Sequence, residues 1–527
     1  MAIGLVLGLC ASTGCKTFLP RRETPDAGMM PQTFSTAGGE QQTPDRWWDT
    51  FNSPQLSALV DEALAENLSL RQAWARLDQA GATAVQAGAS LYPSLDLSAN
   101  AAYERRESTN VTKAPSVRSQ IADAAASGMT TGVTNAVRNQ LNGTTGTTAT
   151  GTTGASTAFQ EDKTTRVKTE TQQYGLGVAA SYEIDLWGRI WSQRQSAEHD
   201  VQATVGDMQT TAMTLASEVA TRWLGIIEQR EKLRVLREQL ETNRTYLELV
   251  ELRFRKSLVS ALDVFQQQQA VAAVEKQIPQ VEAQEQVLRH ELAILLGKPP
   301  QWPFDVGDYD LEQLPPIPPA GIPADLLANR PDIRAAYARL RAADYSVAAA
   351  RADRLPAIRL TGGASYSAGQ IEFLFDDWVA NIAASLTAPL FDGFRRKAEV
   401  ERTLAVVEER LAAYRLTVLT AIGEVEDALV EERLQRDHIE ALSRQLTAAQ
   451  NALDEAAERY RKGLNDYLPV LTALESTQQL TRDLITARRE LLVLRVDLHR
   501  ALGGSWMSAL EAPERLSEEN VIARAED

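Results

Sequence analysis

The chain has 527 residues, of which 54 are basic and 70 are acidic, for a formal net charge of −16. An acidic chain lacks the basic footprint that nucleic-acid binding requires, so no nucleic-acid partner is expected. No run of about 20 apolar residues follows the first few residues, which argues against a transmembrane helix. If the chain spans a membrane, it must do so with strands.

The N-terminal stretch MAIGLVLGLCASTGCKTF contains the only two cysteines, Cys10 and Cys15. The remaining chain therefore has no disulfide framework and no cysteine metal site. The stretch resembles a bacterial lipoprotein signal, in which residues 1–14 are removed and Cys15 carries the lipid. Ser12 stands where such signals usually have leucine, so an ordinary signal peptide or an apolar N-terminus remain alternatives. Apart from this covalent lipid, no cofactor is expected.

Apolar residues on every second position predict four strands. These strands cover about residues 93–103, 174–186, 356–367 and 378–390. The first two flank residues 104–172, whose Thr- and Gly-rich tract cannot build a core and predicts a long mobile loop. Strands of roughly ten residues suit a tilted membrane crossing.

Long helices are predicted between and after the strands. They cover residues 189–256, 262–296, 394–462 and 468–502, and Pro279 is expected to kink the second of them. Leucines at coiled-coil spacing predict helix-to-helix packing along both long helices. The stripes are Leu233, Leu236, Leu240 and Leu247 in the first, and Ile439, Leu442, Leu446 and Leu453 in the third.

An internal repeat organises the chain. The segment ELRFRKSLVSALDV (251–264) aligns with AERYRKGLNDYLPV (457–470) at an offset of 206 residues. The predicted organisation is then a signal peptide (1–14), a lipidated extended segment (15–52), a first repeat (53–298), a linker (299–322), a second repeat (323–504) and a polar C-terminal tail (505–527). Each repeat reads strand, loop, strand, long helix, turn and helix.

Four strands cannot close a barrel, because single-chain barrels begin at eight strands and an open edge in lipid leaves backbone groups unpaired. Twelve strands from three chains would close one. The predicted fold class is therefore mainly α with a membrane β-barrel, in which a homotrimer combines four strands and long helical hairpins from each chain.

These residues resemble the TolC/OprM-type outer-membrane efflux factors, including the NodT-like lipoproteins of RND efflux systems. The resemblance rests on WWDTFNSPQLSALVDEALAENLSLRQAWARL (47–77), YEIDLWGR (182–189), LLANRPDIRAA (326–336) and LTAPLFDGFRRK (386–397), with the RKSL and RKGL turns. Tyr337 departs from it, since the family usually has Glu there. The resemblance implies an outer-membrane homotrimer with a 12-stranded barrel and an α-helical periplasmic tunnel, and it makes the loop of residues 104–172 extracellular. It also implies a periplasmic adaptor, an inner-membrane RND-type pump, and conduction of small molecules rather than catalysis.

The two predicted turns between helices are candidate adaptor contacts. In this interpretation exposed apolar residues pack on adaptor hairpins; the alternative is an ordinary helix-to-helix turn with Gly463 as its C-cap. The candidate residues are Lys256, Ser257, Leu258, Val259, Ser260, Lys462, Gly463 and Leu464.

The second turn also carries candidate residues for a periplasmic gate, namely Asn465, Asp466, Tyr467, Arg459 and Arg461. One Asp466 carboxylate from each of three chains would form a ring that selects cations. The two arginines could hold the tip closed through charge-assisted hydrogen bonds. Asp466 could instead be a helix N-cap, a position that favours aspartate.

The sequence gives little support for catalysis, metal binding or nucleotide binding. The four histidines are scattered and are expected at helix surfaces or interfaces, and no catalytic triad, metal or nucleotide motif follows the leader. The alternatives to an efflux duct are the exit duct of a type I protein-secretion system and a structural lipoprotein that spans the periplasm without conducting.

Overall fold

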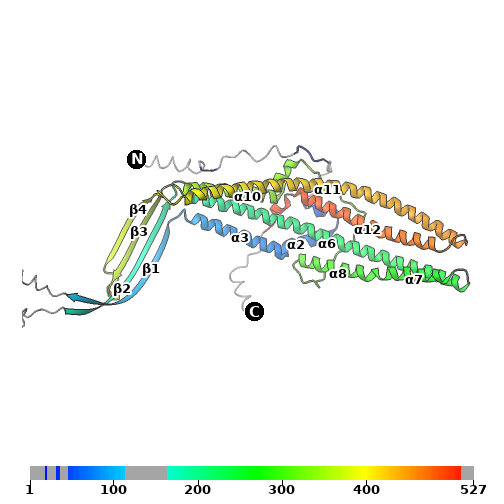
Figure 1. Cartoon of the computed structure of the whole chain (residues 1–527), viewed down its shortest axis with the longest axis horizontal. Helices are drawn as coiled ribbons and strands as arrows, with labels where there is room; N and C mark the ends of the chain where they lie inside the picture. Colours follow the sequence, from blue (N-terminus) through cyan, green and yellow to red (C-terminus); the bar gives the residue numbers. More distant parts are fainter. Residues whose placement is uncertain (1–17, 20–30, 36–44, 113–162, 512–527) are drawn as a thin grey trace, which may run out of the picture. The chain divides into compact units, whose positions relative to one another are not determined.

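The computed structural model describes residues 18–19, 31–35, 45–112 and 163–511. The predicted signal peptide, Cys15, residues 113–162 of the predicted loop and residues 512–527 of the tail lie outside these. The chain divides into a strand unit (93–182 and 359–385) and a helical unit formed by the rest (Figure 1).

The strand unit is one four-stranded sheet in the order β1-β2-β3-β4. Its strands are β1 (Ser94–Thr112), β2 (Lys163–Ile184), β3 (Ala357–Ala368) and β4 (Trp378–Thr387). β1 and β2 are antiparallel, and their register places Leu97 opposite Val178, so the two predicted apolar rows share one face. All four predicted strands are therefore confirmed.

The predicted strand ends were partly wrong. β1 continues nine residues beyond 103 and β2 begins at Lys163, so both ends of the predicted loop 104–172 are strand. There the register pairs Arg105 with Glu170, at 3.6 Å between side chains, and Glu107 with Lys168. Opposite charges across two strands stabilise a ribbon that has no apolar period. β4 ends at Thr387 rather than at 390, because Pro389 cannot donate a ladder hydrogen bond.

Apolar side chains of the sheet remain uncovered. All ten residues of β4 are exposed, and Ile382 is 92% exposed. Leu95 and Leu97 of β1 are exposed as well. No described part of the chain covers this apolar row, which is unusual for a sheet whose surroundings are water.

The helical unit contains two helices of 67 residues each, α6 (Arg189–Arg255) and α11 (Arg395–Arg461), each about 100 Å long at 1.5 Å per residue. The others are α2 (Pro54–Glu66), α3 (Leu68–Ala89), α7 (Ala261–Glu275), α8 (Gln277–Leu295), α9 (Leu326–Asn329), α10 (Pro331–Ala352) and α12 (Leu468–Leu502), with the short 3₁₀ helices η2 (Trp47–Phe51), η3 (Pro323–Asp325) and η5 (Trp506–Ala509). Among the helices of the described ranges, none is both long and apolar enough to cross a bilayer.

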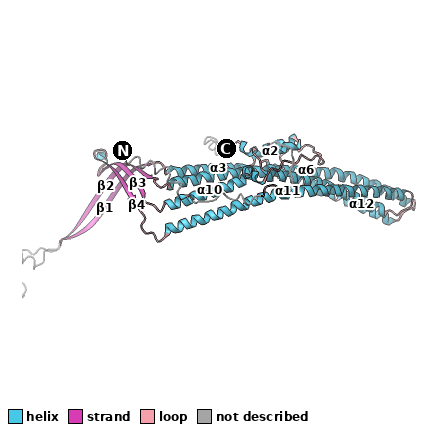
Figure 2. Cartoon of the chain, turned by 90° about the horizontal axis from the view of Figure 1, so that it is seen from above, coloured by secondary structure: helices cyan, strands magenta, loops and turns pink. Residues whose placement is uncertain are grey.

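The order of the helices follows the order of the strands. α3 packs on α6, α6 on α10 and α10 on α11 (Figure 2). In the chain, α3 leads into β1, β2 into α6, α10 into β3 and β4 into α11. The outer helices of the helical unit are therefore α3 and α11, and the outer strands of the strand unit are β1 and β4.

The leucine stripes pack as predicted. Leu236 and Leu240 of α6 contact Val271 and Val274 of α7, and the second repeat packs α11 on α12 in the same way. The predicted helix 262–296 is interrupted instead of kinked, with α7 ending at Glu275 and α8 beginning at Gln277. Pro279 explains the break, since its ring clashes with the carbonyl four residues earlier and has no N–H to bond it.

Segments outside the repeats complete the largest core. η2, within the segment predicted to be extended, buries Trp48, whose ring lies 4.9 Å from that of Trp506 in η5. The linker supplies the Val306 carbonyl, which accepts a hydrogen bond from Trp223 Nε1 at 2.9 Å. The expectations of an extended segment through residue 52 and a polar tail from 505 therefore each missed a short 3₁₀ helix, because their anchoring tryptophans pack on residues distant in sequence.

The RPDIRAA segment fixes the start of α10. Arg330 is buried and donates from Nη1 to Glu424 Oε2 of α11 at 2.6 Å and to the Ala501 carbonyl of α12 at 3.0 Å. Its other nitrogens bind both oxygens of Asp332. One guanidinium thus ties three helices, a task for which its fixed fork of donors is suited.

Candidate functional site: the two helical turns

The turns that end α6 and α11 lie at the same end of the helical unit (Figure 1). Both begin with the same C-cap: the Leu258 N–H donates to the Arg253 carbonyl at 2.9 Å, and Leu464 makes the equivalent bond. The residue before each leucine is left-handed, with φ of 60° at Ser257 and 72° at Gly463. This is the Schellman motif, and it places both leucines at the tips.

Exchanging the residues at the left-handed positions should change stability in opposite directions. Ser257→Gly is expected to raise the free energy of unfolding by up to about 1 kcal/mol, since a Cβ is unfavourable at positive φ. Gly463→Ala is expected to lower it by about 1–2 kcal/mol. A Cβ at Gly463 would meet no atom within 4 Å, so the loss would be conformational. Thermal unfolding followed by circular dichroism measures both, and shifts in the same direction would contradict the explanation.

The tips present apolar surface. Leu258 is 66% exposed and Leu464 is 64% exposed, whereas Val259 packs partly against the cluster beneath the turns. The other predicted adaptor-contact residues are all exposed, namely Lys256, Ser257, Ser260, Lys462 and Gly463. Ser260 is also the N-cap of α7, in a capping box with Asp263.

The predicted gate residues differ in whether another side chain of the protein binds them. Arg459 Nε donates to Asn465 Oδ1 at 3.2 Å, which braces the second turn internally, and Arg461 donates to Glu458 Oε2 at 2.8 Å. Asp466 is exposed, and its carboxylate has no hydrogen bond or ion pair with the described residues. The N-cap position of α12 is occupied by Tyr467, so Asp466 does not cap the helix.

Tyr467 is buried beneath the turn. Its hydroxyl donates to Gln267 Oε1 of α7 at 2.6 Å, and Gln267 Nε2 donates to the Asn243 carbonyl of α6 at 2.7 Å. Burial raises the pKa of the Tyr467 hydroxyl, which therefore stays protonated as a donor. The two hairpins are joined here by a buried polar chain, which costs more than an apolar contact if one partner is lost.

Arg253 is a functional candidate that the sequence analysis did not identify. From the last turn of α6 it donates Nη1 to the Tyr460 carbonyl of α11 at 3.0 Å, and its guanidinium lies 4.2 Å from the centre of the Tyr460 ring. A cation at a helix C-terminus and over an aromatic face is doubly favourable. The repeat pairs Arg253 with Arg459, but sequence could not indicate that only Arg253 crosses to the other hairpin.

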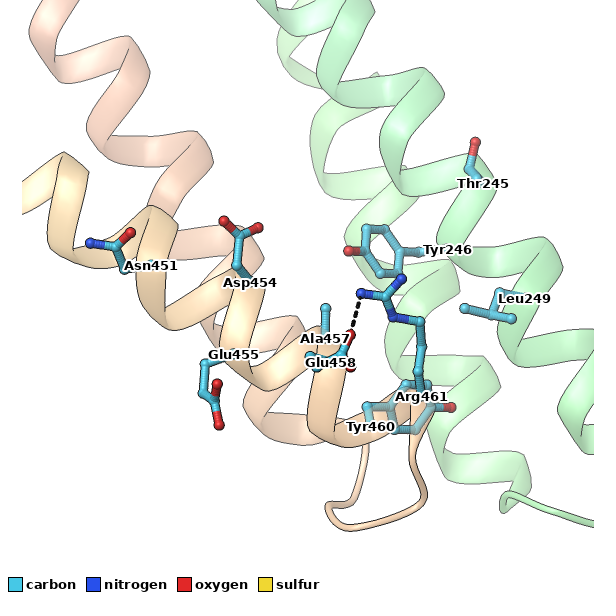
Figure 3. A pocket seen from close by; sticks show the side chains of 10 residues that line it. All are labelled: Thr245, Tyr246, Leu249, Asn451, Asp454, Glu455, Ala457, Glu458, Tyr460 and Arg461. Atoms are coloured by element: carbon cyan, nitrogen blue, oxygen red, sulfur yellow. Dashed lines mark hydrogen bonds and ion pairs between the residues drawn. The ribbon is translucent and has the colours of Figure 1, made fainter.

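A groove of about 820 Å³ separates α6 from α11 near these turns (Figure 3). Its walls carry Tyr246 and Leu249 on one side and Asp454, Glu458 and Arg461 on the other. Burial raises the pKa of the Tyr246 hydroxyl. Within the described ranges no group of three or more His, Cys, Asp or Glu side chains could hold a metal ion. The arrangement offers exposed apolar tips, a free carboxylate and polar ties between hairpins, which suit docking and movement of the tip.

Comparison with known proteins gives concordant matches. The profile of the family described as "Outer membrane efflux protein" matches residues 59–298 and 322–504. The chain is similar to the pyoverdine export outer membrane protein OpmQ of Pseudomonas aeruginosa, with 32% identity over 96% of both chains. It is also similar to the probable outer membrane lipoprotein SilC of Salmonella typhimurium, with 26% identity over 94% of this chain and 96% of SilC. Among solved structures, the outer-membrane channel OprN has a TM-score of 0.73 and 25% identity, covering 93% of this chain and all of OprN.

Proposed function

Because the chain belongs to the outer membrane efflux protein family, we propose that three copies share one barrel and one helical tunnel, which together form the exit duct of a tripartite efflux pump. The chain is an outer-membrane efflux component with a mainly helical fold. The trimer, the partners and the conducting mechanism are the proposal.

The proposed trimer is supported by the two unpaired edges of the sheet and by the two outer helices of the helical unit. β1 and β4 each have one neighbour in the sheet, and α3 and α11 each lie at an end of the helical order. In lipid every unpaired backbone group costs several kcal/mol, so a sheet with two free edges is not a viable membrane structure. Pairing β4 of one copy with β1 of the next removes all edges when three copies close a ring of twelve strands.

The partners follow from the tips. Leu258 and Leu464 would pack on a periplasmic adaptor, and an inner-membrane RND-type pump would supply the energy. Asp466 would contribute one of three carboxylates near the tunnel axis, while Arg253 and Tyr467 hold the hairpins together in the closed tip. The chain itself would conduct and would catalyse nothing.

The cargo class is small molecules. A relative named for pyoverdine export matches over 96% of the chain, which favours small-molecule efflux over the alternative of a type I protein-secretion duct. A non-conducting structural lipoprotein would have no reason to keep the apolar face of its sheet exposed.

Lipidation of Cys15 is part of the proposal. The Phe18 carbonyl accepts a hydrogen bond from Arg351 Nη1 at 2.7 Å, next to the end of α10 that leads into β3. A lipid on Cys15 would enter the bilayer that the strands are proposed to cross.

Light scattering of the protein in mild detergent, with the detergent mass subtracted, tests the shared barrel. A mass near three chains is expected, and the trimer should conduct ions in planar bilayers, with cation selectivity reduced by Asp466→Asn. A folded monomer would contradict the proposal, since it would leave both edges of the sheet unpaired. Folded trimers without conductance would instead favour the structural lipoprotein.

A further inference from the structure

An apolar patch follows β4 in the helical unit, formed by Leu390, Phe391 and Phe394. These side chains are 96%, 84% and 71% exposed, and the two phenylalanine rings contact each other edge to face with centroids 6.3 Å apart. No described residue covers them. Clustered large apolar side chains at this exposure indicate a surface that meets something other than water.

The backbone at the patch is strained in a way that the first repeat avoids. Phe394 precedes α11 with a φ of 66°, in the left-handed region that disfavours residues with a Cβ. Its repeat-related position is Gly188, where a φ of 72° before α6 carries no such penalty. At that junction Trp187 also turns inward, and its Nε1 donates to the Pro356 carbonyl at 2.8 Å. The second repeat therefore keeps a strained, outward ring where glycine would fold more easily, which indicates a function for the ring itself.

The position of the patch points to the membrane. β4 ends at Thr387, so Leu390 lies within about 11 Å of the strand end. Arg396 Nε binds Asp353 Oδ2 at 2.9 Å, which ties the start of α11 to the end of α10. Arg351 of that same end holds the Phe18 carbonyl. The patch thus adjoins the exits to two strands and the segment that follows the proposed lipid site.

The charges beside the patch favour a lipid over another copy of the chain as the molecule that covers it. Arg395 and Lys397 are exposed directly after the patch, and Lys397 Nζ lies 3.7 Å from Glu401 Oε1 in an exposed ion pair that water or a phosphate can replace. Basic groups beside apolar ones suit the phosphates and acyl chains of phospholipids. In the proposed trimer the facing edge of the next copy, residues 85–93 before β1, contains no Asp or Glu that could pair with them. Complementarity therefore favours phospholipid.

We propose that Leu390, Phe391 and Phe394 insert into the periplasmic leaflet of the outer membrane, with Arg395 and Lys397 at the lipid phosphates. This inference rests on the proposed function, in which the strands cross the membrane. The patch would fix the depth of the duct at the point where β4 becomes α11.

Spin labels measure the depth directly. The chain contains no cysteine besides Cys10 and Cys15, so Phe391→Cys, Ile382→Cys and Leu258→Cys each give one new labelling site, with the parent protein as background control. The proteins are placed in vesicles of phosphatidylethanolamine and phosphatidylglycerol. Power saturation then compares collisions of the nitroxide with oxygen, which concentrates in lipid, and with a water-soluble nickel chelate. The ratio is expected to be several-fold higher at 382 and 391 than at the tip position 258.

The three sites separate the possible failures. A lipid-like ratio at 382 with a water-like ratio at 391 would overturn the patch and leave the membrane sheet standing. Low collision with both reagents at 391 would show burial by a neighbouring copy and also overturn the patch. Water-like ratios at both 382 and 391 would overturn the proposed function together with this inference. Introducing Phe394→Gly into the 391-labelled protein is expected to shift its ratio toward the aqueous value while raising the thermal midpoint.

Discussion

Replacing Arg495 with methionine is expected to lower the free energy of unfolding of the helical unit by about 3–5 kcal/mol. Arg495 of α12 is fully buried, and its guanidinium donates to both oxygens of Glu432 in α11, at 3.0 and 2.6 Å, and to the Pro315 carbonyl in the linker. Methionine has a similar volume, but it leaves the buried Glu432 carboxylate with fewer hydrogen-bond donors and removes the donor to the Pro315 carbonyl. Chemical denaturation in detergent, followed by circular dichroism, measures the loss.

The repeat supplies a matched control. Arg289 stands at the related position of α8, but its partner Glu285 and its own guanidinium are partly exposed, so Arg289→Met should cost about 1 kcal/mol or less. The double variant Arg495→Met/Glu432→Gln should recover part of the loss, because no unpaired charge remains buried; the half-exposed Arg436 that also binds Glu432 can turn to water. Equal losses at 289 and 495, or no recovery in the double variant, would show that burial of the ion pair is not the cause.

The long helices and the strands could be predicted because their signals are local. Leucine spacing along α6 and α11 and the period of two in β1 to β4 each require only neighbouring residues. The ends of β1 and β2 could not be placed in this way. Residues such as Arg105 and Glu107 have the composition of a loop until Glu170 and Lys168 are known to lie opposite them. That strand register brings together residues that are far apart in the sequence, so local patterns cannot predict it.

The candidate site likewise combines features that local sequence predicts with features that depend on residues far apart in the chain. The caps of the two turns follow from RKSL and RKGL, since left-handed positions near helix ends have local signatures. The ties between hairpins do not, because Tyr467 meets Gln267, and Arg253 meets Tyr460, across some 200 residues. Tyr467 was predicted to belong to the gate, and the fold places its hydroxyl in a buried chain of hydrogen bonds that joins the two hairpins.

His499 illustrates how a distant segment changes the chemistry of a residue. It was expected at a helix surface or interface, and it lies buried at the interface with η2, where it stacks on Trp47 with ring centroids 5.4 Å apart. Its Nε2 has no hydrogen-bond partner among the residues that the structure describes. Burial, assisted by the positive charge of Arg495, lowers the pKa of the imidazole to about 3. The N-terminal segment therefore packs on a neutral histidine.

A pH dependence of stability follows from this neutral histidine. In the unfolded chain the pKa of His499 returns to about 6.5, so between pH 6.5 and 3 the unfolded state binds the extra proton. The stabilising contribution is thus complete above pH 6.5 and is lost as the pH falls, by about 1.4 kcal/mol per pH unit and about 3 kcal/mol by pH 4. His499→Gln, which cannot titrate, should flatten the curve of unfolding free energy against pH over this window, whereas the exposed His290→Gln should leave it unchanged. Carboxylates contribute equally to parent and variant, so the difference between the two curves isolates the histidine, and parallel curves would mean that the imidazole binds its proton at the same pH in the folded and unfolded protein.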